Sequence, residues 1–348
     1  MKQMTRFLIE EQRLHKNATG NFTALVNDIR LACKRIATLI GKGALADAGT
    51  VNVHDERQEK HDVLANEIFV RTNEWGGQLA GMASDEMEAP HVIPADYPRG
   101  RYLLLFDPLH GSSNVDVNGT VGSIFSVLRC PEDVSVPSTD HFLQPGVRQV
   151  CAGYAIYGPS TMLVLTTGRG VHGFTLDREI GEFMLTHPDL RIPESTSEFA
   201  INASNSRYWE SPIRRYVNEC QAGAAGPRGR DFNMRWIASL VAEAHRILMR
   251  GGVFMYPRDR KDLSKPGPLR LLYEANPIGF LIEQAGGRAS TGREPILTIE
   301  PEALQQRIGL VFGAREEVER IERYHRECDG FEYQAPLFGA RNALRNLA

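Results

Sequence analysis

The chain has 348 residues, and its 40 Lys and Arg against 43 Asp and Glu give a formal net charge of −3. With 42% apolar and 24% charged residues, its composition is typical of a soluble globular protein. The near-neutral charge argues against a nucleic-acid-binding protein, which is normally basic. The length predicts two domains and is sufficient for a large core without disulfides or structural metals.

Cysteine usage and the N-terminus indicate a cytoplasmic protein. The five cysteines include no CxxC pair, which argues against a thiolate zinc site and favours reduced thiols. The first residues, MKQMTRFLIEEQRLHK, carry charges throughout and lack the apolar stretch of a signal peptide. The aliphatic run Leu103–Phe106 is far shorter than the ~20 residues of a membrane helix. We therefore expect no membrane partner.

Hydrophobic spacing predicts the elements of the first half. A helix is expected over 19–43, then a polar surface loop over 44–60, and a second helix from about Asp62 to Trp75. Residues 88–100 are rich in proline and read as a loop. Strands are expected over the following ranges: 102–106, 121–129, 149–157 and 162–176. Gly168 and Gly170 mark a hairpin turn in the last of these.

The pattern changes after His187. INASN (201–205) reads as a strand end that opens into a turn, and 222–231 is a Gly/Ala/Pro-rich connector. Helices are predicted over 234–250 and 269–285, separated by a strand over 251–257 and a charged loop over 258–268. Mixed strands and helices predict a layered α/β or α+β fold. We place the domain boundary near 190–200.

Four acidic segments are candidates for chemistry. Asp85-Glu86 follow two small residues, Asp107 ends a buried apolar strand, Asp62 opens a predicted helix, and Glu274 lies on the late helix. Hard divalent cations such as Mg²⁺ take oxygen ligands, and a strand end holds a carboxylate rigidly. The turn Gly111-Ser112-Ser113 offers backbone N–H groups and hydroxyls to a phosphate. Together these features indicate phosphoryl chemistry.

Each feature also has an ordinary structural explanation. An Asp after a strand commonly forms a turn, and Gly-Ser-Ser is commonly only a loop. A Glu four residues after Arg270 commonly makes a surface ion pair. The order in which these segments occur along the chain favours a functional site over these ordinary structural explanations.

The segment FDPLHGSSNVDVNGTVGSIFS (106–126) resembles the signature of the class I fructose-1,6-bisphosphatases. The resemblance continues in order over about residues 5–330, through TRFLIEEQR, the Lys60-His61-Asp62 region, ASDE, INASN, NMRWIAS, GGVFMYP and LRLLYEANP. It implies a five-layer αβαβα fold with two subdomains: a metal-binding and regulatory one over 1–195 and a sugar-phosphate-binding one over 196–348. It also implies a Mg²⁺-dependent phosphatase that forms a homotetramer or a dimer.

The resemblance assigns roles to individual residues. The implied metal ligands are Asp85, Glu86, Asp107, the backbone carbonyl of Leu109, His110 and Glu274. The implied catalytic groups are Asp62 as proton acceptor, Glu86 as the alternative activator of water, and Asp107. The departing phosphate would be held by Gly111, Ser112, Ser113 and Arg270. The distal phosphate would be held by Asn205, Tyr208, Tyr256 and, from a neighbouring subunit, Arg235, whose guanidinium suits that task.

Three positions depart from the family pattern. His110 stands where the family has Asp, so the site loses one negative charge, which predicts weaker Mg²⁺ binding or a shift toward Mn²⁺ or Zn²⁺. The alternative is that His110 turns away and water fills its place. Pro268 stands where a Lys usually contacts substrate, and Lys265 is a possible substitute. Asp85 replaces the usual Glu and is one methylene shorter.

A second, regulatory site is implied by the resemblance. Thr19, Gly20, Asn21 and Thr23 match a phosphate-binding turn for AMP at a helix start, with Arg101 and Tyr102 as further contacts. The alternative is that Thr19-Gly20 simply caps the helix.

The leading hypothesis is metal-dependent hydrolysis of the C1 phosphate of fructose 1,6-bisphosphate, and of sedoheptulose 1,7-bisphosphate as a second substrate. The alternative, motivated by His110 and Pro268, is a catalytically weakened relative that binds sugar phosphate or AMP in a regulatory role. A phosphatase for inositol phosphates or a nucleotide fits the DPL-x-GS core but not the full-length resemblance.

Overall fold

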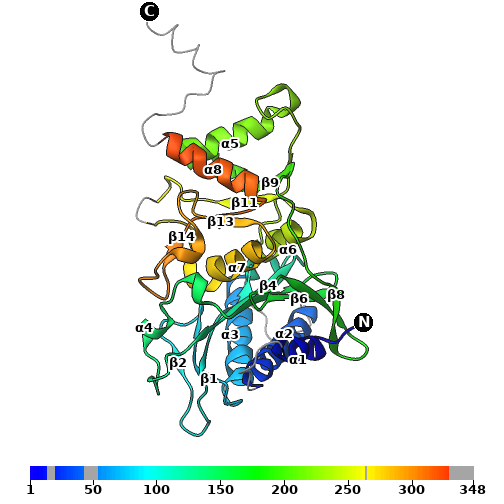
Figure 1. Cartoon of the computed structure of the whole chain (residues 1–348), viewed down its shortest axis with the longest axis vertical. Coiled ribbons are helices and arrows are strands. Elements are labelled where there is room, and N and C mark those ends of the chain that lie inside the picture. Colours follow the sequence, from blue (N-terminus) through cyan, green and yellow to red (C-terminus); the bar gives the residue numbers. More distant parts are fainter. Residues whose placement is uncertain (14–19, 43–53, 263–264, 329–348) are drawn as a thin grey trace, which may run out of the picture.

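The computed structural model describes residues 1–13, 20–42, 54–262 and 265–328. Its elements form five layers (Figure 1). Helices α1, α2 and α3 cover the outer face of an eight-stranded sheet, and α6 and α7 lie between this sheet and a five-stranded one. Helices α5 and α8 cover the far face of the second sheet. The predicted αβαβα architecture is confirmed.

The described helices vary from one turn to more than five turns. They are α1 (Met4–Arg13), α2 (Asn21–Gly41), α3 (His54–Asn73), α4 (Thr139–Phe142), α5 (Ser211–Gln221), α6 (Leu240–Arg250), α7 (Asn276–Gln284) and α8 (Arg315–Cys328). Short 3₁₀ turns are η2 (Ser112–Asn114), η3 (Gly146–Arg148), η4 (Ala203–Tyr208), η5 (Gly223–Ala225) and η7 (Ile296–Thr298). One π-helical turn, η6, spans Leu271–Ala275.

The first sheet has the strand order β2-β1-β3-β4-β5-β6-β7-β8, and all neighbours are antiparallel except β1 and β3. Its strands are β1 (Leu79–Ser84), β2 (His91–Val92), β3 (Tyr102–His110), β4 (Val121–Arg129), β5 (Cys151–Tyr157), β6 (Thr161–Thr166), β7 (His172–Asp177) and β8 (Glu182–His187). The central strands are apolar on both faces because helices cover both. The hairpin predicted at Gly168 and Gly170 is confirmed, and both glycines have positive φ.

The second sheet has the order β10-β9-β11-β15-β13. Its strands are β9 (Glu198–Ile201), β10 (Asn233–Met234), β11 (Val253–Tyr256), β13 (Arg288–Ser290) and β15 (Leu310–Gly313). A separate two-stranded ladder pairs β12 (Leu269–Arg270) with β14 (Arg307–Ile308). The first sheet therefore ends at His187 and the second begins at Glu198.

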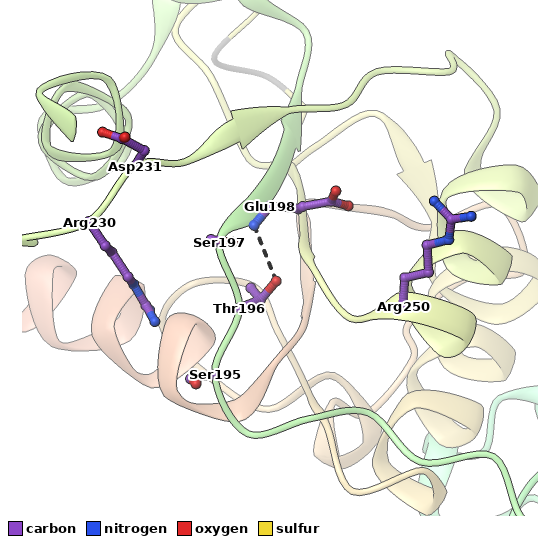
Figure 2. A pocket seen from close by; sticks show the side chains of 7 residues that line it. All are labelled: Ser195, Thr196, Ser197, Glu198, Arg230, Asp231 and Arg250. Carbon is purple, nitrogen blue, oxygen red and sulfur yellow. Dashed lines mark hydrogen bonds between the residues drawn. The ribbon is translucent and has the colours of Figure 1, made fainter. Parts of the chain in front are cut away.

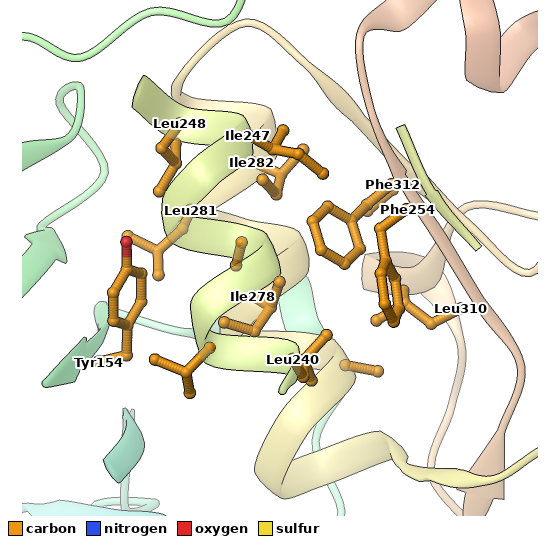
Figure 3. Packing of buried hydrophobic residues seen from close by; sticks show 14 of the residues in the cluster. Tyr154, Leu240, Ile247, Leu248, Phe254, Ile278, Leu281, Ile282, Leu310 and Phe312 are labelled. Carbon is orange, nitrogen blue, oxygen red and sulfur yellow. The ribbon is translucent and has the colours of Figure 1, made fainter. Parts of the chain in front are cut away.

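The largest described apolar cluster lies in the middle layer (Figure 3). Leu240 and Ile247 of α6 and Ile278 and Leu281 of α7 pack between the two sheets. Tyr154 of β5 closes this cluster on one side. Each Å² of apolar surface buried in this cluster contributes roughly 25 cal/mol of stabilisation. The cluster therefore holds the two sheets together.

Three sequence predictions need correction. The chain is already helical from His54, so 54–60 are not a loop and Asp62 lies inside α3. The segment HDERQEK lacks apolar periodicity, but Glu, Gln, Arg and Lys are good helix formers. Residues 43–53, the rest of the predicted loop, lie outside the described part, and the helix ends at Asn73 instead of Trp75.

The helix predicted over 234–250 begins only at Leu240. Asn233–Met234 pair in parallel with β9, and Ser239 caps α6 by accepting a hydrogen bond from the backbone of Ala242. Ile237, which precedes the observed helix, is 43% exposed. The pairing with β9 therefore overrides the apparent helical period.

The helix predicted over 269–285 is divided into three parts. Leu269–Arg270 form β12, the π-helical turn η6 follows, and only Asn276–Gln284 are α-helical. Pro277 lies at the start of α7, where its missing N–H costs least. Glu274 is thus placed by a π-helical turn, which is a frequent feature of functional sites.

Among the described residues, no helix is both long and apolar enough to cross a membrane.

A buried charge cluster fixes the 222–231 connector against α5 and α8. Glu317 of α8 is 1% exposed and accepts hydrogen bonds from Arg228 at 2.6 Å, Arg230 at 2.8 Å and Tyr216 at 2.7 Å. The Arg228 side chain is itself only 3% exposed. Removal of one member of such a pair leaves a buried charge without compensation.

We expect Glu317→Ala to lower the free energy of unfolding by about 3–5 kcal/mol, because Arg228 would remain buried and unpaired. Glu319→Ala on the same helix is the matched control, since Glu319 pairs with Arg315 at 4.0 Å on the surface, and its cost should be about 0–1 kcal/mol. Denaturant unfolding measures both. Equal costs for the two variants would contradict this account.

Candidate functional site

The candidate site is built around Asp107 in β3. Phe106 stacks on Phe69 of α3 with ring centroids 4.6 Å apart, so the side chain of Asp107 lies on the opposite face of the strand. That face packs against η6, which carries Glu274. Asp107 is 5% exposed and Glu274 is 6% exposed, so two carboxylates from distant segments are buried together.

An irregularity in β3 shapes the backbone after Asp107. The register with β4 shifts between Asp107 and His110. The hydroxyl of Ser123 donates to the carbonyl of Pro108 at 2.7 Å and is bonded to the hydroxyl of Tyr157 at 2.7 Å. Leu109 N donates to Oδ1 of Asp107 at 3.2 Å. The strand end is therefore held from both sides.

His110 lies between the two buried carboxylates. Its Nδ1 is 2.9 Å from Oδ2 of Asp107 and 3.1 Å from Oε1 of Glu274. Burial opposes a charge on the imidazole, but the hydrogen bonds and negative charges of Asp107 and Glu274 outweigh it and raise the pKa of His110 to about 10. The alternative in which His110 turns away from the site is not what the structure shows.

The turn after β1 carries two further carboxylates. Burial, together with the charges of Asp107 and Glu274, raises the pKa of Asp85 to about 6, while Arg270 acts in the opposite direction. Arg270 Nε donates to Oδ1 of Asp85 at 2.7 Å. Burial also raises the pKa of Glu86, with Asp107 and Asp85 adding to the rise. These mutual effects place all four carboxylates in one electrostatic cluster.

The Gly-Ser-Ser turn adjoins this cluster. Gly111 adopts φ 77°, which favours glycine, and begins the 3₁₀ turn η2. Ser112 Oγ donates to Oδ2 of Asp62 at 3.1 Å, while Ser113 is exposed. Burial and the charge of Glu86 raise the pKa of Asp62 to about 7. A potential proton acceptor thus lies beside a turn suited to phosphate.

The residues predicted for the distal phosphate are only partly assembled. Asn205 and Tyr256 line a narrow pocket with Trp209 and Asp259. The pocket holds about 10 Å³, room for roughly one water molecule, so these side chains must separate to admit a phosphate. Tyr208 is not among its lining residues and instead packs under the guanidinium of Arg207 at 4.7 Å.

Arg235 lies elsewhere in this chain. Its Nε donates to Oε1 of Glu198 at 3.3 Å, and the side chain is 53% exposed. Glu198 belongs to an open depression of about 640 Å³ at the start of β9 (Figure 2). The depression is lined by Ser195, Thr196, Ser197, Glu198, Arg230, Asp231 and Arg250. None of the predicted site residues lines this depression.

The residues predicted for AMP gather at the start of α2. Gly20 is the N-cap with φ 87° and offers no side chain for capping, Asn21 is the first helical residue, and Thr23 donates its hydroxyl to Gln12. Tyr102 lies 6.0 Å from the ring of Phe22. Arg101 is exposed and pairs with Glu132 at 3.5 Å. Thr19 lies outside the described residues.

Arg129 lies beside the predicted AMP residue Tyr102 and was not among the residues predicted from the sequence. It pairs directly with Tyr102 across β3 and β4, and its guanidinium lies 5.8 Å from the Tyr102 ring. The position could be found from the sequence only by assuming the register of strands 102–106 and 121–129. It adds a cation against the ring of Tyr102, which itself lies beside Phe22 of α2.

The site fits a divalent cation by its donor atoms. Asp107, His110 and Glu274 each offer one ligand atom, and these atoms lie within 4.8 Å of one another. The buried carboxylates Asp107 and Glu274 and the adjacent Asp85 and Glu86 supply the hard oxygen donors that Mg²⁺ and Mn²⁺ prefer. His110 can act as a ligand only after its imidazolium loses a ring proton.

Comparison with known proteins agrees with this geometry. Residues 2–188 match the family "Fructose-1-6-bisphosphatase, N-terminal domain", and residues 192–326 match the corresponding C-terminal domain. The fold and the two matches define a protein of the sugar-phosphatase type. The chain belongs to the fructose-1,6-bisphosphatase class 1 family.

The similarity covers nearly the whole chain. It is 63% identical to the fructose-1,6-bisphosphatase class 1 of Hydrogenophilus thermoluteolus, over 99% of this chain and 97% of that protein. It is 62% identical to one from Methylibium petroleiphilum, over 97% and 96% of the two chains. The crystal structure of Leishmania major fructose-1,6-bisphosphatase in holo form superposes with a TM-score of 0.84 at 35% identity, covering 93% of this chain and 99% of that one.

We expect His110 of the metal-free protein to titrate near pH 10 instead of 6.5, because Asp107 and Glu274 stabilise its charged form. Its folded pKa exceeds its unfolded value, so its stabilisation is full below pH 6.5 and is lost as the pH rises through about 10. Nitrogen-15 NMR of the imidazoles measures this. His245 is the internal control, since burial and then the charge of His187 lower its pKa to about 4. A His110 midpoint near 6.5 would contradict the bridge.

Proposed function

We propose that this protein hydrolyses the C1 phosphate of fructose 1,6-bisphosphate to fructose 6-phosphate and phosphate, with sedoheptulose 1,7-bisphosphate as a second substrate. The observation that carries the proposal is the convergence of Asp85, Asp107 and Glu274, from three distant segments, beside the Gly111–Ser113 turn. Family membership supports the substrate class. Members of this family depend on a metal, and we propose Mg²⁺, with Mn²⁺ or Zn²⁺ as alternatives because of His110.

The proposed mechanism divides the work among these residues. The Gly111–Ser113 turn and Arg270 hold the oxygens of the departing phosphate. A cation bound by Asp85, Glu86, Asp107, His110, Glu274 and the Leu109 carbonyl would neutralise phosphoryl oxygens and lower the pKa of a nearby water. Water oxygen bonds to phosphorus as the bond from phosphorus to the C1 oxygen breaks, and the C1 oxygen takes up a proton from solvent to become the hydroxyl of fructose 6-phosphate. Asp62, already bonded to Ser112, takes the proton that water loses, with Glu86 as the alternative.

The distal half of the substrate would be held by the second half of the chain. We propose that Asn205, Tyr208 and Tyr256 bind the other phosphate and that Arg235 reaches the same phosphate of a neighbouring subunit. The exposed Arg235 side chain, flanked by Met234 at 46% and Ile237 at 43% exposure, supports such a contact. A homotetramer, or a dimer, follows from this proposal. Residues 1–195 then form the metal-binding and regulatory subdomain and 196–348 the sugar-phosphate subdomain.

The start of α2 is the candidate regulatory site. We propose AMP binding at Gly20, Asn21 and Thr23, with Tyr102, Arg101 and Thr19. The positive dipole end of α2 and the cation of Arg129 support an anion at this place.

The buried thiols of Cys33, Cys130, Cys151 and Cys220 support a reducing, cytoplasmic location.

The test is phosphate release from fructose 1,6-bisphosphate by the full chain, with Mg²⁺, Mn²⁺ and Zn²⁺ titrated separately. We expect release with at least one metal, inhibition on addition of AMP, and a loss of at least about 100-fold in kcat for Asp107→Asn. Sedoheptulose 1,7-bisphosphate is tested in parallel. A folded protein that releases no phosphate with any metal would instead support the alternative, a binding relative without catalysis.

We expect His110→Asp to raise Mg²⁺-supported turnover and to lower the Mg²⁺ concentration for half-maximal activity by about 10-fold. The substitution removes an imidazolium that is bonded to the carboxylates of Asp107 and Glu274, and it adds a hard oxygen donor. His110→Asn is the control, since it removes the ring without adding charge. Unchanged or weaker Mg²⁺ activation in His110→Asp would contradict the charge argument.

A further inference from the structure

A glutamine side chain from the second half of the chain contacts the backbone of the acidic turn that carries Asp85 and Glu86. Gln305 precedes β14, and its Nε2 donates to the carbonyl of Met87 at 3.0 Å. The same nitrogen lies 3.4 Å from the carbonyls of Ser84 and Asp85. One amide group therefore faces three backbone carbonyls of the turn that carries Asp85 and Glu86.

The orientation of this amide is determined by its surroundings. An exchange of Nε2 and Oε1 would place the oxygen against three carbonyl oxygens, which repel it. In the orientation observed, Oε1 is buried without a partner within the described residues. The side chain thus gives up one hydrogen bond in order to keep its donor on the turn, and such a loss carries a free-energy cost.

The N–H groups of the same turn donate to acceptors in the first half of the chain. Asp85 N donates to the carbonyl of Phe106 at 3.1 Å, and Met87 N donates to the carbonyl of Ser84 at 3.1 Å. Glu86 N donates to the hydroxyl of Ser84 at 3.2 Å. The backbone N–H groups of the turn are therefore bonded within the first half, whereas its backbone carbonyls face the amide of Gln305.

The residues after Gln305 hold the other side of the site. The carbonyl of Gln306 accepts from Leu271 N at 2.8 Å, and the Arg307 guanidinium donates to the carbonyl of Pro268. Arg270 and Arg307 are directly paired across β12 and β14. Arg270 in turn contacts both Asp85 and Glu274, through its side chain and its backbone N–H. The segment 305–307 therefore spans the two groups of carboxylates.

We infer that Gln305 is a positioning residue that fixes the spacing of Asp85 and Glu86 relative to Glu274, so that the cluster can bind a divalent cation. The inference rests on the proposed function. Carboxylates crowded into one buried site repel one another and push the turn outward when no cation is bound. The bond from Gln305 opposes this displacement, so its loss should weaken cation binding more than it weakens the fold.

The test uses Mn²⁺ alone as the probe, with free Mn²⁺ measured by electron paramagnetic resonance during titration of the full chain. We expect Gln305→Ala to weaken Mn²⁺ binding by about 10-fold. The Mn²⁺ concentration for half-maximal phosphate release should rise by the same factor, while kcat at saturating Mn²⁺ stays within about 3-fold, because ligands and phosphate contacts are intact.

Gln306→Ala is the matched control. Gln306 is equally half-buried in the same segment, but its Oε1 accepts from Glu302 N and it makes no side-chain contact with the acidic turn among the described residues. We expect its Mn²⁺ affinity and melting temperature to equal those of the wild type. If Gln305→Ala fails to fold, Gln305→Asn replaces it, since this amide is one methylene too short to reach Met87.

The outcomes separate the two proposals. Mn²⁺ affinity that is unchanged in the folded Gln305 variant, or lowered equally by Gln306→Ala, overturns the positioning role. A wild-type protein that neither binds Mn²⁺ nor releases phosphate overturns the proposed function instead. A selective loss in the Gln305 variant, with a melting temperature like that of the control, supports the inference.

Discussion

The structure depends on the burial of several carboxylates at one point where strand β3 of the first sheet packs against the π-helical turn η6. Asp107 and Glu274 are almost fully buried, and Asp85 and Glu86 adjoin them. Such an arrangement is costly unless positive charge compensates it. Arg270 supplies one positive charge to Asp85, and His110 bridges Asp107 and Glu274. The local backbone, including the shift in β3 and the π-helical turn, serves to bring these groups into contact.

The carboxylates of the candidate site come from both halves of the chain, which makes the site sensitive to how the halves are joined. Asp107 lies in β3 and Asp85 directly follows β1, whereas Arg270 ends β12 and Glu274 lies in the π-helical turn η6 that follows it. The apolar middle layer fixes the two sheets together, and Gln305 and Arg270 fix the acidic turn locally. Apolar packing thus holds the two sheets together, and a few directional hydrogen bonds set the positions of the carboxylates.

The sequence predicted those elements whose patterns are local. Strand 121–129 and the hairpin at Gly168 and Gly170 form as expected, because their apolar runs and turn glycines need no partner to be recognised. The predicted helices over 234–250 and 269–285 begin later than expected, because Met234 pairs with β9 and Leu269–Arg270 pair with β14, and neither partner is visible in a local helical spacing. The carboxylates were identifiable from their motif, whereas Arg129 and Gln305 act through register and backbone contacts that no motif records.

His110 alters the charge balance of the site in both of its states. In the metal-free protein an imidazolium between Asp107 and Glu274 compensates two buried charges that an aspartate would leave repelling one another. When a cation binds, the same imidazolium must lose its proton or withdraw, because the cation competes for the same oxygens. We therefore expect the histidine to stabilise the state without metal at the expense of the state with metal. Because linkage ties these two effects together, weaker cation binding and a more stable metal-free fold would be two consequences of the same residue.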